Sequence, residues 1–127
     1  MPVTRDADDR ALGVVYTPPD VARPMVRMAL DALSATTAED ILGLRVCDPA
    51  IGEGAFLVEV VAVLAERLLA AWRREGLVRS EAEARRAISA RCIFGIDVDE
   101  QAVAAARSAL DAGERALRVG DALGFDW

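Results

Sequence analysis

The chain has 127 residues, of which 54% are hydrophobic, enough for one domain with a modest core and too apolar for a disordered chain. Its net charge of −6, from 15 basic and 21 acidic residues, argues against tight binding to DNA phosphates, which depends on Lys and Arg. It contains no histidine, which excludes Ser-His and Cys-His nucleophilic schemes and most zinc sites.

The N-terminal part reads as a polar segment followed by a helix. Residues 1–12 are expected to be a mobile tail without a signal peptide, which favours a cytoplasmic location. Thr17 is a candidate N-cap and Pro18 the first helical residue, with a kink or a late start at Pro24. Apolar residues at helical spacing predict one buried face. They are Val21, Met25, Met28, Ala29 and Leu33.

A glycine-containing turn follows the first predicted strand. The segment from Ser34 to Glu39 is read as a polar connection, and Leu44–Cys47 as a short apolar strand that runs into the turn Asp48–Gly54. Glycines here let the backbone turn tightly and let a ligand approach it closely. The N-terminus of the next helix points its free N–H groups into the same space. The pattern predicts a cofactor site of the nucleotide type.

Helices and strands alternate over the rest of the chain, which predicts an α/β fold with a parallel sheet and right-handed crossovers. Gly76 is a candidate C-terminal cap, Ser80 and Glu83 form a capping-box pattern, and Asp99 is a candidate N-cap. The predicted helices are 54–75, 80–90 and 99–110, and the predicted strands are 92–96 and 117–119. The stretch 55–65, the most apolar one, is too short to span a bilayer, so no membrane partner is expected.

The acidic residues after the strands indicate which cofactor binds. A dinucleotide fingerprint would have a third glycine where Leu57 stands, and Asp48 would repel a pyrophosphate, so a nicotinamide cofactor is disfavoured. Asp48 suits a cationic group instead. Asp97, after the second strand, is placed to accept both hydroxyls of a ribose, and Asp121, after the third, could accept from an adenine amine. These three groups match the three polar parts of S-adenosylmethionine.

The motifs resemble those of adenine-specific DNA methyltransferases of restriction-modification systems. Residues 13–20, GVVYTPPD, resemble the family's upstream cofactor motif, and Asp48–Leu57 resembles its D-P-A-x-G-x-G-x-F-L motif. Phe94–Asp99 is similar to its ribose-binding strand, and Gly120–Leu123 to the motif that follows. Two positions depart from the pattern: Ile51 stands where the family often has cysteine, and Glu53 where it often has serine.

The resemblance implies a Rossmann-like methyltransferase fold, of which residues 13–127 hold the first half only, with about three parallel strands and flanking helices. It implies S-adenosylmethionine as the cofactor and transfer of its methyl group to the exocyclic amine of an adenine flipped out of DNA. The cofactor-binding residues that it implies are Tyr16, Thr17, Pro18, Asp48, Ala50, Ile51, Gly52, Gly54, Phe56, Asp97, Val98, Asp121 and Ala122.

The family's catalytic Asn/Asp-Pro-Pro-Tyr/Phe motif does not occur in these 127 residues, so no catalytic residue is assigned. Pro18-Pro19 is the only Pro-Pro pair, and it belongs to the upstream motif. We therefore expect no methylation by this chain alone and contact with DNA only through regions outside it.

Two alternatives stay open at this stage. One is a non-catalytic half, or a remnant, that needs a second chain to complete the sheet, because the open side of the first strand would expose an edge. The other is a methyltransferase that acts on protein or RNA. Cys47 and Cys92, each inside a predicted strand, are expected to be buried core residues.

Overall fold

Three short parallel strands form one sheet in the order β1-β2-β3. The computed structural model describes residues 19–49, 51, 52, 54–113, 115–121 and 123. The strands are β1 (Val46–Asp48), β2 (Ile93–Asp97) and β3 (Leu117–Val119). The α/β fold and its parallel sheet are thus confirmed, whereas the expectations for residues 1–18, Ala50 and Ala122 lie outside the described residues.

The register of the sheet brings the ends of all three strands to one edge. Asp48 of β1 pairs with Gly95 of β2, and Asp97 of β2 pairs with Val119 of β3. In the part of the chain that the structure describes, β1 has β2 on one side and no strand on the other. The carboxyl ends of parallel strands are where α/β sheets bind ligands.

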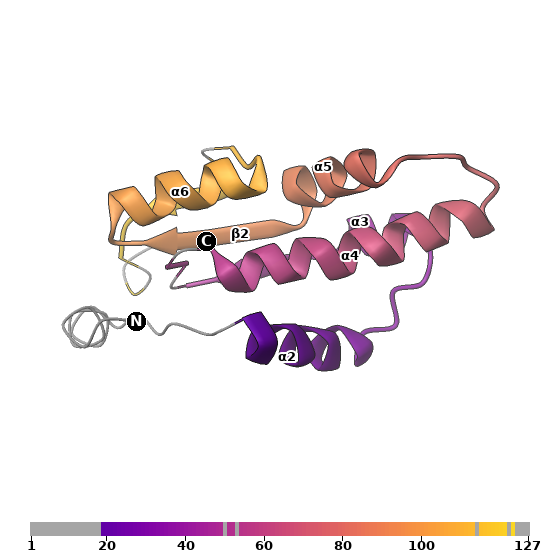
Figure 1. Cartoon of the computed structure of the whole chain (residues 1–127), viewed down its shortest axis with the longest axis horizontal. Coiled ribbons are helices and arrows are strands. Elements are labelled where there is room, and N and C mark those ends of the chain that lie inside the picture. The colour runs from indigo at the N-terminus through magenta and orange to yellow at the C-terminus, as the bar shows by residue number, and fades with distance from the viewer. Residues whose placement is uncertain (1–18, 50, 53, 114, 122, 124–127) are drawn as a thin grey trace.

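Helix α4 is the central helix of the molecule. Figure 1 shows it between α2 and α5, and it also contacts α3, α6 and β1. The helices are α2 (Pro19–Asp31), α3 (Ala38–Leu42), α4 (Ala55–Arg74), α5 (Glu81–Arg91) and α6 (Glu100–Leu110). The core joins apolar side chains of α4 to those of the sheet, including Leu57, Val60, Leu64, Ile93 and Leu117. Among the described helices, none is long and apolar enough to cross a membrane.

The caps expected at Ser80, Asp99 and Gly76 are confirmed. The Ser80 side chain accepts from the Glu83 N–H while the Glu83 carboxylate accepts from the Ser80 N–H, which is a complete capping box. Asp99 caps α6 by accepting from two backbone N–H groups. After α4, Gly76 adopts a φ of 80°, and the Leu77 N–H donates to the Trp72 carbonyl at 2.8 Å, as in a glycine-terminated helix.

The prediction for the buried face of α2 is wrong. Among the described side chains of the helix, Val26 and Leu30 are buried, whereas Met25, Met28, Ala29 and the following Leu33 are exposed, Met28 by 76%. Nothing is described of the Val21 side chain. The helix also begins before Pro24 and continues through it, so no late start occurs at that residue.

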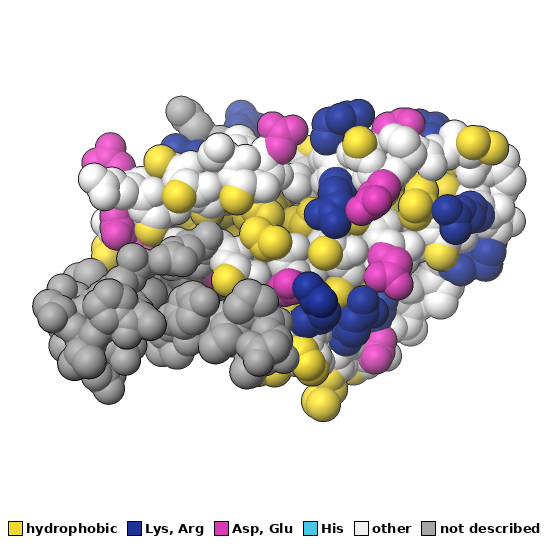
Figure 2. All heavy atoms as spheres, in the orientation of Figure 1, with side chains coloured by type: hydrophobic (Ala, Val, Ile, Leu, Met, Phe, Trp, Pro, Cys, Tyr) yellow, Lys and Arg dark blue, Asp and Glu magenta, His cyan; other side chains and the backbone are white. Residues whose placement is uncertain are grey.

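Ion pairs between α2 and α4 account for the orientation of α2. Arg23 donates to both carboxylate oxygens of Glu59, at 3.0 and 3.2 Å, and Arg27 donates to Glu66 at 3.2 Å. Figure 2 shows basic and acidic side chains side by side along this line. Because Glu59 is buried in α4, it needs a cationic partner. The orientation of α2 that brings Arg23 to Glu59 also turns Val26 and Leu30 toward the core.

Helix α3 was not predicted from the sequence, in which Ser34–Glu39 was expected to be a polar connection. Thr37 caps it, since its hydroxyl accepts from the Asp40 N–H at 3.1 Å. Its residues Ala38 and Ile41 are buried against the core. The first strand consequently starts two residues later than expected and ends at Asp48.

The two cysteines lie in different surroundings. Cys92 is buried, as expected, although it follows the end of α5 and precedes β2 rather than lying in the strand. Cys47 is exposed, which contradicts the prediction. It belongs to β1, which is an edge strand of the described sheet.

Candidate functional site

The loop between β1 and α4 has the left-handed backbone that its glycines allow. Gly52 has a φ of 58° and Gly54 a φ of 83°, values that strain residues with a side chain. The Gly54 N–H donates to the Ile51 carbonyl at 3.0 Å, which closes the turn, and the Gly54 carbonyl accepts from the Val58 N–H at 2.8 Å. The predicted tight turn into a helix N-terminus is therefore confirmed.

Strand β2 holds this loop by two hydrogen bonds. The Ile51 N–H donates to the Ile96 carbonyl at 3.2 Å, and the Gly52 N–H donates to Asp97 Oδ2 at 2.8 Å. Asp97 Oδ1 accepts from the Asp99 N–H, also at 2.8 Å. With 3% of its surface exposed, Asp97 connects the loop to the turn before α6.

Close packing brings the loop against β2 and α6. A Cβ on Gly54 would lie 3.2 Å from Ala106 Cβ of α6. A Cβ on Gly95 of β2 would lie only 2.7 Å from Ile51 Cγ1. The Ile51 side chain is accordingly buried in the core, so this residue would face a cofactor with its backbone. Gly95 was not among the site residues predicted from the sequence, although a glycine inside a strand is a known signal of close approach.

The other described candidates surround the same edge of the sheet. Asp48 is half-buried at the end of β1, Phe56 is partly buried against the core, and Val98 is 49% exposed after β2. Asp121 is exposed beyond β3, where its Oδ1 accepts from the Leu123 N–H at 3.0 Å. Asp48 and Asp97 are thus the last residues of β1 and β2, and Asp121 follows β3, at the same edge of the parallel sheet.

The donors and acceptors at this edge suit an organic cofactor. Carboxylates can receive an ammonium group, a diol and an amine, which are all donors. Among the described residues, no group of three or more His, Cys, Asp or Glu side chains could hold a metal ion.

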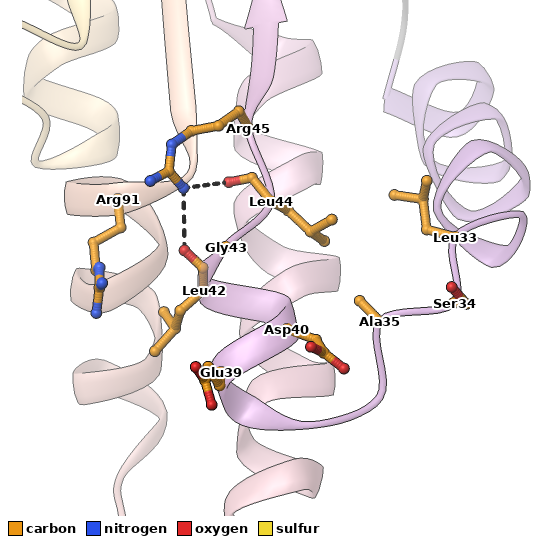
Figure 3. Close-up of a pocket in the computed structure, with 10 residues that line it drawn as sticks. All are labelled: Leu33, Ser34, Ala35, Glu39, Asp40, Leu42, Gly43, Leu44, Arg45 and Arg91. Atoms are coloured by element: carbon orange, nitrogen blue, oxygen red, sulfur yellow. Dashed lines mark hydrogen bonds between the residues drawn. The ribbon is translucent and has the colours of Figure 1, made fainter.

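A hollow lies at the opposite end of β1 (Figure 3). This open groove of about 640 Å³ is lined by residues that include Leu33, Leu44, Arg45 and Arg91. Arg45 closes part of it by donating to the carbonyls of Leu42 and Leu44, at 3.1 and 2.9 Å. Since α/β sheets bind ligands at the carboxyl ends of their strands, the groove is not the candidate site.

Comparison with known proteins gives a family and several solved structures, one of which is described here. The profile of the N-6 DNA methylase family matches residues 4–111. No curated protein sequence matches the chain. A modification subunit of a putative type I restriction enzyme from Vibrio vulnificus YJ016 is 24% identical, with a TM-score of 0.39. The match covers 96% of this chain and 28% of that subunit, so this chain spans less than a third of its length.

Proposed function

This chain belongs to the N-6 DNA methylase family, and we propose that the carboxyl edge of its sheet binds S-adenosylmethionine. The observation that carries the proposal is the loop between β1 and α4, whose left-handed glycines lie beside the carboxylates that end β1 and β2. When bound, S-adenosylmethionine would supply an electrophilic methyl group on its sulfonium. The residues of this chain would bind and orient it.

Each carboxylate has a proposed partner on the cofactor. Asp48 would receive the ammonium group, Asp97 the ribose hydroxyls and Asp121 the adenine amine. Each oxygen of Asp97 accepts one backbone N–H, and a carboxylate oxygen can accept a second donor. Asp97 can therefore bind a ribose while it still holds the loop. The remaining candidates would border the cofactor, including the undescribed Tyr16, Thr17, Pro18, Ala50 and Ala122.

We further propose that this chain is the cofactor-binding part of a restriction-modification enzyme that methylates adenine in DNA. Membership of the family supports DNA methylation. The exocyclic amine of adenine as the methyl acceptor and a cytoplasmic location of the protein are parts of the proposal. The 127 residues contain no Asn/Asp-Pro-Pro-Tyr/Phe, so residues outside them would bind the flipped adenine. A net charge of −6 also favours DNA contacts from elsewhere.

The proposed partner is a polypeptide segment that pairs with the free side of β1. The support is structural, because β1 has one neighbour in the described sheet and Cys47 in its middle is exposed. A strand edge presents unpaired backbone groups that favour such an addition. The segment could come from further sequence of the same protein or from a second chain.

A thermal melt with and without S-adenosylmethionine tests cofactor binding. A ligand that binds only the folded chain stabilises it by about 2.7 kcal/mol at a concentration of 100 Kd, so the melting temperature should rise. NADH should cause no rise. A cooperative melt whose midpoint temperature does not change when S-adenosylmethionine is added would contradict the proposal.

Matched acidic variants show whether the rise depends on the proposed edge. Asp48→Asn should reduce the rise, because it removes the charge proposed to face the ammonium. Asp40→Asn is the control, since Asp40 is an exposed acid of α3 that lines the groove at the other end of β1, and it should leave the rise unchanged. Equal loss in both variants would show a general charge effect instead.

A further inference from the structure

We propose that Gly95 of β2 is a positioning residue for the loop between β1 and α4, because the absence of a side chain there lets Ile51 lie against the strand. A Cβ at Gly95 would lie 2.7 Å from Ile51 Cγ1, 3.0 Å from Ile51 Cδ1 and 3.2 Å from the Asp48 carbonyl oxygen. The 2.7 Å distance requires the Ile51 side chain to shift, and the other two distances are tighter than ordinary contacts. Gly95 does not have the positive φ that favours glycine, so its requirement is one of space.

Ile51 transmits the position of β2 to the rest of the loop. Its side chain is 3% exposed, its N–H donates to the Ile96 carbonyl, and its own carbonyl accepts from the Gly54 N–H. A displacement of Ile51 would therefore break its bond to β2 and move the start of α4. The Asp48 carbonyl is also close to Gly95, so the same displacement would reach the residue proposed for the ammonium group.

Asp97 provides a second attachment two residues further along β2. Its carboxylate accepts from the Gly52 N–H at 2.8 Å. The loop thus contacts β2 at three successive residues: Gly95 by packing, Ile96 by its carbonyl and Asp97 by its carboxylate. The shape of the loop is set by the neighbouring strand as well as by Gly52 and Gly54.

The consequence for binding rests on the proposed function, whereas the positioning itself does not. Gly95→Ala should disturb the amide environment of the loop in the chain without ligand, and it should weaken S-adenosylmethionine binding more than its effect on folding explains. Hydrogen exchange at single amides separates the two statements, because it reports local opening without a ligand.

The first measurement is amide exchange in the unsubstituted chain. The Ile51 and Gly52 amides should exchange slowly, although they lie in a turn, because β2 accepts both N–H groups. Exchange as fast as that of an exposed turn would overturn the proposal before any substitution is made.

The second measurement compares Gly95→Ala with two controls. Gly95→Ala should speed exchange of the Ile51 and Gly52 amides by about tenfold or more, the change that ~1.4 kcal/mol produces in an equilibrium. The Leu68 amide in α4 is the reference, and its exchange rate should change only as far as global stability changes. Gly113→Ala should change neither the exchange of the loop amides nor that of the Leu68 amide, because a Cβ there meets nothing within 4 Å. Leu68→Ala, a core change outside the loop, should lower stability without a selective effect on the loop amides.

A second-site substitution tests the route through Ile51. Ile51→Ala removes Cγ1 and Cδ1, so adding it to Gly95→Ala should slow exchange of the Gly52 amide again, or restore folding if Gly95→Ala alone does not fold. Absence of any restoration, or unchanged loop amides in Gly95→Ala, would overturn the proposal. If the loop amides respond as expected and the unsubstituted chain does not bind S-adenosylmethionine, the proposed function fails and the positioning role stands.

Discussion

The carboxylate of Asp97 accepts a hydrogen bond from the backbone N–H of Gly52 at 2.8 Å, although the two residues are 45 positions apart in the chain. Asp97 ends β2, and Gly52 is a left-handed residue of the loop after β1. The bond therefore joins the two structural parts proposed to bind one cofactor. It also gives Asp97 a role in the unliganded chain, beside the proposed role toward a ribose.

Replacing Asp97 by Asn should destabilise the chain by about 2 kcal/mol, within the range for a buried hydrogen-bonding group left without its partner. Asp97 accepts from the N–H groups of both Gly52 and Asp99, and the amide nitrogen of Asn cannot accept from either. Urea unfolding measures the loss. Asp99→Asn is the matched control and should be nearly neutral, because Asn is as good an N-cap as Asp. Equal losses in both variants would contradict a special role for Asp97.

Arg23→Ala should lower the melting temperature more than Arg27→Ala does. Each arginine connects α2 to a glutamate of α4, but the Glu59 side chain that pairs with Arg23 is 9% exposed, against 66% for Glu66. The hydrogen bond to Glu59 also raises the pKa of Arg23 above its ordinary value. Removing Arg23 leaves a buried carboxylate without its cation, which costs more than the loss of a solvated pair. Differential scanning calorimetry measures the melting temperatures. Similar decreases for the two variants would argue against this account of how α2 is oriented.

The capping box of α5 should make stability fall as the solution becomes acidic. The hydrogen bond from the Ser80 backbone N–H is the main cause that lowers the pKa of Glu83 below its ordinary value. A depressed pKa means that the charged form stabilises the folded chain above the ordinary pKa, and that this contribution is lost as the pH falls through the lowered value. Thermal melts at pH 7 and pH 3 measure this loss. The melting temperature of Glu83→Gln should fall less between the two pH values than that of the unsubstituted chain, because Gln keeps a capping-box acceptor without a titrating group. The same pH dependence in both proteins would refute the assignment.

One cysteine should react quickly with a thiol reagent in the folded chain, and the other only after unfolding. Cys47 is exposed, whereas Cys92 is buried and burial raises the pKa of its thiol, which disfavours the reactive thiolate. Counting labelled thiols against time, with Cys47→Ser as the control that removes the fast phase, measures the difference. A fast phase that persists in Cys47→Ser would show that Cys92 is accessible.

The same labelling tests the partner proposed for β1. If a segment of protein pairs with the free side of this strand, Cys47 should label more slowly in the full assembly than in the isolated chain. Unchanged labelling in an assembly that methylates DNA would place the partner elsewhere.

Local signals in the sequence were sufficient for most of the secondary structure and for the loop. The caps at Ser80 and Asp99 and the turn glycines Gly52 and Gly54 depend on hydrogen bonds and backbone angles within a few residues. Such features can be predicted because their physical causes lie within the same short stretch. The alternation of strands and helices then predicted the parallel sheet, and β3 has the expected bounds. The short α3 was missed, because its five residues contain too few apolar positions to show a period.

Tertiary structure decided the features that depend on distant partners. The inward face of α2 follows from the contact of Arg23 with Glu59, 36 residues away, and helical periodicity within α2 does not contain that information. The need for glycine at position 95 arises only when Ile51 is placed against the strand. Cys47 was expected to be buried because its segment is apolar, yet β1 has a single neighbour in the described sheet. The sequence by itself thus determined the local backbone, whereas packing between distant segments decided which side chains are buried and what holds the proposed cofactor loop.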